Sequence, residues 1–162
     1  MIKKVVYATV IFFLLIGCSK KAEVPAGSSP QFSLKGIDNN QINLSDYKGR
    51  VVLIDFWATW CPPCRATIPV IERLYARYKD KGFVVLGLSV ADSPDAVRSF
   101  RDANKMQYPI AMADDKTEKL YGVRGIPSMF LLDKDGRIVE HITGYDETLE
   151  SFLDDKINSL LK

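Results

Sequence analysis

Apolar residues recur along this chain in the two periods that are typical of strands and of helices. Residues 51–56 (Val-Val-Leu-Ile-Asp-Phe) and residues 83–90 are almost continuously apolar, as in strands that are buried on both faces of a sheet. Residues 32–34 and 42–44 alternate apolar with polar positions around a turn-like segment, which predicts a small N-terminal hairpin. Three further short strands are expected, at residues 108–112, 129–132 and 137–142.

Between these strands, apolar residues fall at the helical spacings of three and four. An amphipathic helix is predicted over residues 62–79, and Pro69, which cannot donate a backbone hydrogen bond, predicts a kink inside it. The Ser-Pro pair at residues 93–94 is typical of the start of a second helix. The inward side chains of this second helix are expected to be Val97, Phe100 and Ala103.

Two more helices are predicted in the C-terminal third. A short one is expected at residues 117–121, where Gly122 ends it, and Asp146 is expected to cap the last one. The buried stripe of that last helix is expected to comprise Leu149, Phe152, Leu153, Ile157, Leu160 and Leu161.

These elements predict one α/β domain at residues 31–162. Their order is β-β-β-α-β-α-β-α-β-β-α, which describes a mixed central sheet with helices on both faces. The chain has 162 residues, of which 47% are apolar, and this is enough for one well-packed core. We therefore expect a single globular domain, and we expect it to be monomeric.

The N-terminus is typical of an export signal. Lys3 and Lys4 precede an apolar run at residues 5–17, which is shorter than the roughly 20 residues that a membrane-spanning helix needs. Residues 15–18 (Leu-Ile-Gly-Cys) resemble the lipobox of bacterial lipoproteins, in which the cysteine is lipidated and becomes the new N-terminus. We therefore expect a signal peptide at residues 1–17 and lipidation of Cys18, with an uncleaved signal anchor as the alternative.

Both interpretations of the N-terminus place the domain outside the cytoplasm, attached to a bacterial membrane. Residues 18–30 are polar and rich in Gly, Pro and Ser, which is typical of a tether between lipid and domain. Removal of Lys3 and Lys4 with the signal leaves 20 basic against 20 acidic side chains. A balance near zero gives no indication of nucleic acid as a partner.

The sequence between the first buried strand and the first long helix contains a Cys-Pro-Pro-Cys motif at residues 61–64. Cys61 is expected at the first turn of the helix, where unpaired N–H groups and the helix dipole stabilise an anion and lower the pKa of a thiol. Cys64 lies about one turn further on the same face, close enough to form a disulfide. The pair is therefore predicted to be a two-electron redox switch.

Several features together resemble the thioredoxin fold. They are the run Asp-Phe-Trp-Ala-Thr-Trp-Cys-Pro-Pro-Cys at residues 55–64, Pro69 five residues after Cys64, and Gly125-Ile126-Pro127 before a strand. The N-terminal hairpin, an inserted strand and helix at about residues 83–104 and the lipobox narrow the resemblance to the TlpA/ResA-like branch. Members of this branch are membrane-attached extracytoplasmic thiol-disulfide oxidoreductases, and the resemblance covers about residues 30–160.

The resemblance implies a role for each matching residue. Cys61 would be the nucleophile that attacks a substrate disulfide, and Cys64 would be the resolving thiol. Asp55 matches the buried acid of thioredoxin, and burial would raise its pKa so that it could accept the proton of Cys64. Many members of the TlpA/ResA branch instead carry a Glu three residues after the second cysteine, where this chain has Thr67. This difference favours proton handling by Asp55.

The resemblance also implies a docking surface beside the cysteines. Pro127 would follow a cis peptide bond that turns the backbone of Ile126 toward an extended substrate segment. Trp60 next to Cys61 is expected to line the same surface. The residues predicted to bind substrate are Trp60, Pro62, Pro63, Ile126 and Pro127. His141, the only histidine, is expected to be a solvated side chain on an edge strand.

The predicted function is reduction of protein disulfides, which in proteins of this kind include those of apocytochrome c, with electrons from a membrane thiol carrier. The pair Pro62-Pro63 removes two N–H groups that could stabilise a Cys61 thiolate, which favours a reducing potential. The first alternative is an oxidase that forms disulfides in exported proteins. The second is a copper- or zinc-binding thiol protein without catalytic activity.

Neither a cofactor nor a resident metal is expected for the predicted reaction. A peroxidase of the peroxiredoxin type is excluded by the residues before Cys61. Its signature needs Thr three residues and Pro seven residues before the cysteine, and this chain has Ala58 and Ile54 at those positions.

Overall fold

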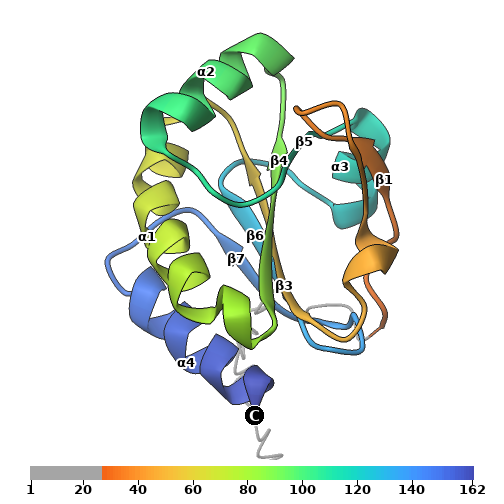
Figure 1. The fold of residues 1–162 in the computed structure, drawn as a ribbon, viewed down its shortest axis with the longest axis vertical. Coiled ribbons are helices and arrows are strands. Elements are labelled where there is room, and N and C mark those ends of the chain that lie inside the picture. Colours follow the sequence, from red (N-terminus) through yellow and green to blue (C-terminus); the bar gives the residue numbers. More distant parts are fainter. Residues whose placement is uncertain (1–26) are drawn as a thin grey trace, which may run out of the picture.

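A computed structural model describes residues 27–162, in which a mixed sheet lies between two layers of helices (Figure 1). The predicted order of elements is confirmed. The strands are β1 (Ser33–Lys35), β2 (Gln41–Asn43), β3 (Val51–Trp57), β4 (Phe83–Ser89), β5 (Ile110–Met112), β6 (Ser128–Leu132) and β7 (Ile138–Thr143). The helices are α1 (Pro62–Tyr78), α2 (Pro94–Asn104), α3 (Asp115–Tyr121) and α4 (Leu149–Leu161), and two single 3-10 turns lie at η1 (Leu44–Tyr47) and η2 (Lys79–Lys81).

The central sheet has the strand order β5-β4-β3-β6-β7. β3 pairs with β4 and β4 pairs with β5 in parallel, whereas β6 is antiparallel to both β3 and β7. All seven residues of β3 and all seven of β4 are buried. This explains why the two runs lack the alternation of a half-exposed strand, since each of these strands is covered on both faces.

The helices cover the two faces of the sheet unequally. In Figure 1, α1 and α4 lie on one side of the strands, whereas α3 and the β1–β2 hairpin lie on the other. α2 lies next to the beginning of α1, where the Arg65 guanidinium is 5.8 Å from the centre of the Phe100 ring. α1 is one continuous helix that contains Pro69, whose side chain is exposed.

The predicted N-terminal hairpin is confirmed, and it forms a separate two-stranded sheet beside the edge strand β5. β1 and β2 pair antiparallel, one residue away from the predicted strand limits at each end. The Ile37 backbone N–H donates to the Ile110 carbonyl at 3.0 Å, which ties the hairpin to β5.

The segment that precedes the hairpin is part of the domain. Ser28 forms a bridge with Arg137, the Ser29 N–H donates to the Gly136 carbonyl at 2.8 Å, and the Tyr121 hydroxyl donates to the Pro30 carbonyl at 2.8 Å. Residues 28–30, which were expected to belong to a tether over residues 18–30, are therefore held against the domain. The predicted signal peptide and Cys18 lie outside the described residues.

Three of the expected helix positions are wrong. Ala103 is exposed, because α2 is amphipathic with a narrow inward stripe in which Val97 is buried and Phe100 is half-buried. Phe152 is 36% exposed, because it lies on the side of α4 that does not face the core. The last helix is preceded by Thr148 rather than Asp146, whose carboxylate accepts hydrogen bonds from the Thr148 N–H and hydroxyl in the turn before the helix.

Candidate active site

The two cysteines meet at the beginning of α1, as the spacing predicted. β3 ends at Trp57, a short turn follows, and Cys61 is the N-cap of α1 in extended conformation. Cys61 and Cys64 form a disulfide with their Cα atoms 5.3 Å apart. The Cys64 backbone N–H donates to Cys61 Sγ at 3.2 Å. The start of the helix therefore directs a hydrogen-bond donor at Cys61 Sγ, an arrangement that favours a thiolate on this sulfur.

Access to the disulfide is from the Cys61 side. Cys61 keeps 4% of its surface exposed, whereas Cys64 has none. Trp60 is 59% exposed, and its indole N–H donates to the Ala91 carbonyl at 3.3 Å, so this large ring is held beside the opening. A thiolate that attacks from solvent would reach Cys61 first.

The loop before β6 closes the other side of the cysteines. The Ile126–Pro127 peptide bond is cis, as expected, and Pro127 is buried. The Ile126 carbonyl oxygen lies 3.9 Å from Cys61 Sγ, and the Pro127 carbonyl accepts a hydrogen bond from the Gly144 N–H at 2.9 Å. Residues that are 65 positions apart in the chain are thereby brought into contact at the sulfur.

Pro62 and Pro63 occupy the first two positions of α1, and both are exposed beside the disulfide. Neither has a backbone N–H, so the Cys64 N–H is the first helical donor that Cys61 Sγ can use. Of the residues predicted to bind substrate, Trp60, Pro62 and Pro63 lie on the helix side of the disulfide. Ile126 and Pro127 lie on the loop side.

An open pocket of about 740 Å³ adjoins the loop that carries Ile126 and Pro127. One of its walls contains His141, which is half-buried and not the solvated side chain that was expected. The ring stacks on Phe130 with centroids 4.1 Å apart, and Nε2 lies 2.9 Å from the Ser128 hydroxyl. Desolvation lowers the pKa of His141.

The sequence pattern did not reveal this environment of His141. β6 and β7 pair with Phe130 opposite His141, and a register shift follows at Leu131 and Leu132. A turn at residues 133–136 predicts a hairpin but does not by itself specify which residues are opposite one another. The register of β6 and β7 therefore decides that His141 lies opposite Phe130.

Asp55 lies in the middle of β3 and is fully buried. Desolvation by burial raises the pKa of its carboxyl to about 7. Thr67, three residues after Cys64, is also fully buried, and its hydroxyl donates to the Cys64 carbonyl at 2.8 Å. Asp55 is thus a buried acid that can exchange a proton near neutral pH, whereas Thr67 is occupied in a backbone hydrogen bond.

The comparisons with known proteins agree with this site. Residues 26–141 match the model of the AhpC/TSA family. Thiol-disulfide oxidoreductase ResA of Bacillus anthracis is 38% identical over 130 residues, which are 77% of this chain and 74% of the relative. ResA of Bacillus subtilis (strain 168) is 31% identical over 140 residues, 85% of this chain and 77% of the relative.

Solved structures show the same fold. A crystal structure from Chlorobium tepidum, described as a thiol:disulfide interchange protein DsbE, superimposes with a TM-score of 0.80 at 32% identity and covers 85% of this chain and 97% of that chain. A second thiol:disulfide interchange protein from Chlorobium tepidum TLS has a TM-score of 0.78 at 25% identity, over 87% and 100% of the two chains.

A redox-active cysteine pair at a helix start, a cis-proline loop against it and relatives of one activity lead to the same conclusion. The chain belongs to the AhpC/TSA family and is a thiol-disulfide oxidoreductase of the thioredoxin fold.

Proposed function

We propose that this protein reduces disulfides of extracytoplasmic proteins while it is attached to a membrane. The observation that carries the proposal is the donor set around Cys61. The first two residues of α1 are prolines, which have no backbone N–H group. The Cys64 backbone N–H donates the hydrogen bond that Cys61 Sγ receives from the helix, with the nitrogen 3.2 Å from the sulfur. A thiolate with few donors is less stable, so the dithiol gives up its electrons more readily.

The reaction proceeds through two exchanges of sulfur. The Cys61 thiolate attacks one sulfur of the substrate disulfide, and the electron pair of that bond leaves on the other sulfur. Cys64 then loses its proton to Asp55 and attacks Cys61 Sγ, which forms the Cys61–Cys64 disulfide and releases the second substrate thiolate. The burial that raises the pKa of Asp55 to about 7 supports its role as the proton acceptor.

An extended segment of the substrate is proposed to lie between Trp60 and the loop at Ile126 and Pro127. The exposure of Trp60 and the contact of the Ile126 carbonyl with Cys61 support this docking mode. Pro62 and Pro63 would contact the same segment. The resemblance to the TlpA/ResA-like branch adds the disulfide of apocytochrome c, before haem attachment, to the proposed substrates.

The proposed anchor is a lipid on Cys18, with a membrane thiol carrier as the electron donor. No helix within residues 27–162 is long and apolar enough to cross a membrane. The test is membrane fractionation of the full chain and of Cys18→Ala. Anchoring by lipid predicts that only the unchanged chain sediments with membranes. Equal sedimentation of both would support the uncleaved signal anchor instead.

A redox titration of the Cys61–Cys64 pair tests the direction of electron flow. A reductase predicts a potential below about −200 mV, whereas a value near about −120 mV would contradict the proposal and support a disulfide-forming oxidase. Pro63→Ala restores one backbone donor at the helix start. One hydrogen bond to a charged group contributes about 1.5 kcal/mol, so this variant should be more oxidising by about 30 mV.

Metal binding is examined with the same reduced protein. No group of three or more metal-ligating side chains occurs within residues 27–162. If the reduced protein bound copper or zinc tightly and failed to reduce insulin, the proposal of a reductase would be wrong.

A further inference from the structure

Three buried side chains on one face of the sheet carry polar atoms that have no hydrogen-bond partner within residues 27–162. They are the carboxylate of Asp55, the indole Nε1 of Trp57 and the hydroxyl of Tyr108. All three residues are buried. Because buried polar groups in folded proteins are almost always hydrogen-bonded, three such groups in one place indicate a partner that they share.

Gly87 on β4 is the point around which these groups gather. Gly87 is the register partner of Asp55, and neighbouring strands lie about 4.8 Å apart. A Cβ atom on Gly87 would lie 3.0 Å from Tyr108 Cε2 and 3.1 Å from Trp57 Nε1. Only a residue without a side chain lets the phenol ring and the indole nitrogen approach β4 so closely beside the carboxylate.

We propose that Asp55, Trp57 and Tyr108 bind one water molecule beside Gly87, and that Tyr108 is thereby a positioning residue for Asp55. In this arrangement the indole N–H and the phenol O–H donate to the water oxygen, and the water donates to a carboxylate oxygen of Asp55. A buried water makes about three hydrogen bonds, which is the number that these groups supply.

The bound water would stabilise Asp55 in its ionised form, in which it can accept the proton of Cys64. The inference therefore rests on the proposed function, in which Asp55 is that acceptor. Burial, together with the nearby charges of Asp55 and Glu72, raises the pKa of Tyr108 well above its usual value. The phenol consequently stays protonated and acts as a donor.

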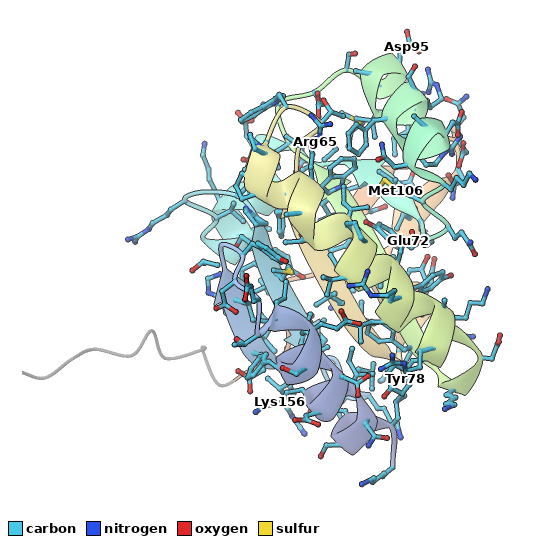
Figure 2. The ribbon with its side chains drawn as sticks, turned by 90° about the vertical axis from the view of Figure 1, so that its left-hand side faces the viewer. Arg65, Glu72, Tyr78, Asp95, Met106 and Lys156 are labelled. Carbon is cyan, nitrogen blue, oxygen red and sulfur yellow. A yellow bond between two sulfur atoms is a disulfide. The ribbon has the colours of Figure 1, made fainter. Side chains whose placement is uncertain are left out.

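Several titratable groups lie on the elements packed around the carboxylate of Asp55. They are Tyr108 in the segment before β5 and, on α1, Cys64, Arg65, Glu72, Arg73, Tyr75, Arg77 and Tyr78. Of these, Arg73, Arg77 and Tyr78 bind acidic side chains of α4, and the Arg65 guanidinium lies over the Phe100 ring. Its register partners on β4 and β6, Gly87 and Met129, do not titrate. The Glu72 carboxylate accepts a hydrogen bond from the Gln107 backbone N–H at 2.8 Å and lies close to the segment of Met106 (Figure 2).

The test is Tyr108→Phe in the full chain, with Tyr75→Phe as the matched control. Tyr75 packs edge-on against Tyr108 with ring centroids 6.1 Å apart, so the control removes the other hydroxyl of the same aromatic pair. We expect Tyr108→Phe to raise the pKa of Asp55, followed by carbon NMR of its carboxyl, by about one pH unit. The rate of release of reduced substrate at pH 7 should fall about fivefold, and the pH profile should move upward by the same interval.

Two results would overturn the inference. One is an Asp55 titration in Tyr108→Phe that matches those of Tyr75→Phe and the unchanged protein. The other is a high-resolution crystal structure without a water molecule in hydrogen-bond contact with Asp55 and Tyr108. A merely structural role of Tyr108 would lower the melting temperature but leave the Asp55 titration in place.

The variant Asp55→Asn separates this inference from the proposed function. If substrate release keeps its pH profile in Asp55→Asn, Asp55 is not the proton acceptor and the proposed mechanism fails. If that profile disappears while Tyr108→Phe has no effect, the mechanism stands and the water site is wrong.

Discussion

The two faces of β3 differ in chemistry although they belong to one strand. On one face, Phe56 packs against Tyr121 and Phe130 at centroid distances of 5.5 and 5.9 Å, and these two rings are 5.1 Å apart. On the other face, Asp55 places a carboxylate without a hydrogen-bond partner in residues 27–162 beside Trp57. Both faces contribute stability through apolar burial, but the second also contains an acid whose burial destabilises the fold.

The difference lies in one polar position, because Val51, Leu53 and Trp57 on the same face as Asp55 are fully buried apolar residues too. Alternation along a strand allows this, because residues 55 and 56 point to opposite faces. The effect of a substitution on one face can therefore be measured separately from the effect of a substitution on the other face.

The largest effect is expected at the cysteines. Cys61→Ser should abolish disulfide reduction, because the attacking thiolate is lost. Cys64→Ser should stop the reaction at the mixed disulfide on Cys61, which mass spectrometry of the protein after incubation with substrate would detect. Accumulation of the adduct in Cys61→Ser instead would reverse the assigned roles of the two sulfurs.

On the aromatic face, Phe56→Ala should lower the free energy of unfolding by about 3–5 kcal/mol, because it leaves a cavity among fully packed rings. Urea unfolding measures the loss, and the redox potential of the cysteine pair should not change while the protein is folded. Phe152→Ala is the matched control, since Phe152 is exposed on α4. A loss equally large in the control would mean that burial does not explain the effect.

On the acidic face, Asp55→Asn should slow substrate release by about a hundredfold and stabilise the fold above neutral pH. The pKa of Asp55 rises from 3.8 to about 7 on folding, so the destabilisation is absent below about pH 4 and complete above about pH 7. This destabilisation by the ionised Asp55 carboxylate amounts to roughly 4 kcal/mol at most.

Urea unfolding of Asp55→Asn and the unchanged protein at pH 4 and pH 8 measures this difference. The stabilisation should appear only at pH 8, and Asp102→Asn, a change at an exposed carboxylate on α2, should produce none at either pH. A gain of equal size at both pH values would show that desolvation of a charge is not its cause.

The smallest effect is expected at the rim of the site. Trp60→Ala should raise KM for a protein substrate several-fold and leave the unfolding free energy within about 0.5 kcal/mol, because the ring is largely exposed. Steady-state reduction of insulin measures KM, and Leu120→Ala, an exposed apolar residue on α3, is the control. An unchanged KM would show that Trp60 is not part of the docking surface.

Much of the candidate site was predictable because its parts are local in the chain. A strand followed by two prolines and a helix places Cys61 and Cys64 one turn apart whatever the rest of the fold does. The cis bond before Pro127 and the burial of Asp55 were predicted from the resemblance and are both present. The surroundings of His141 and Tyr108 were not predicted, because they depend on strand register and on packing between distant segments.

The sequence by itself determined the order of the elements, the pair of sulfurs at the start of α1 and the apolar character of β3 and β4. These follow from periodicity, turn residues and spacing, which act over a few residues. Only the tertiary structure decided that the Ile126 carbonyl lies against Cys61 and that Gly87 brings Trp57 and Tyr108 close to one another. Such contacts join segments 21 to 65 residues apart, and their geometry is set by sheet register and side-chain packing, which no local pattern specifies.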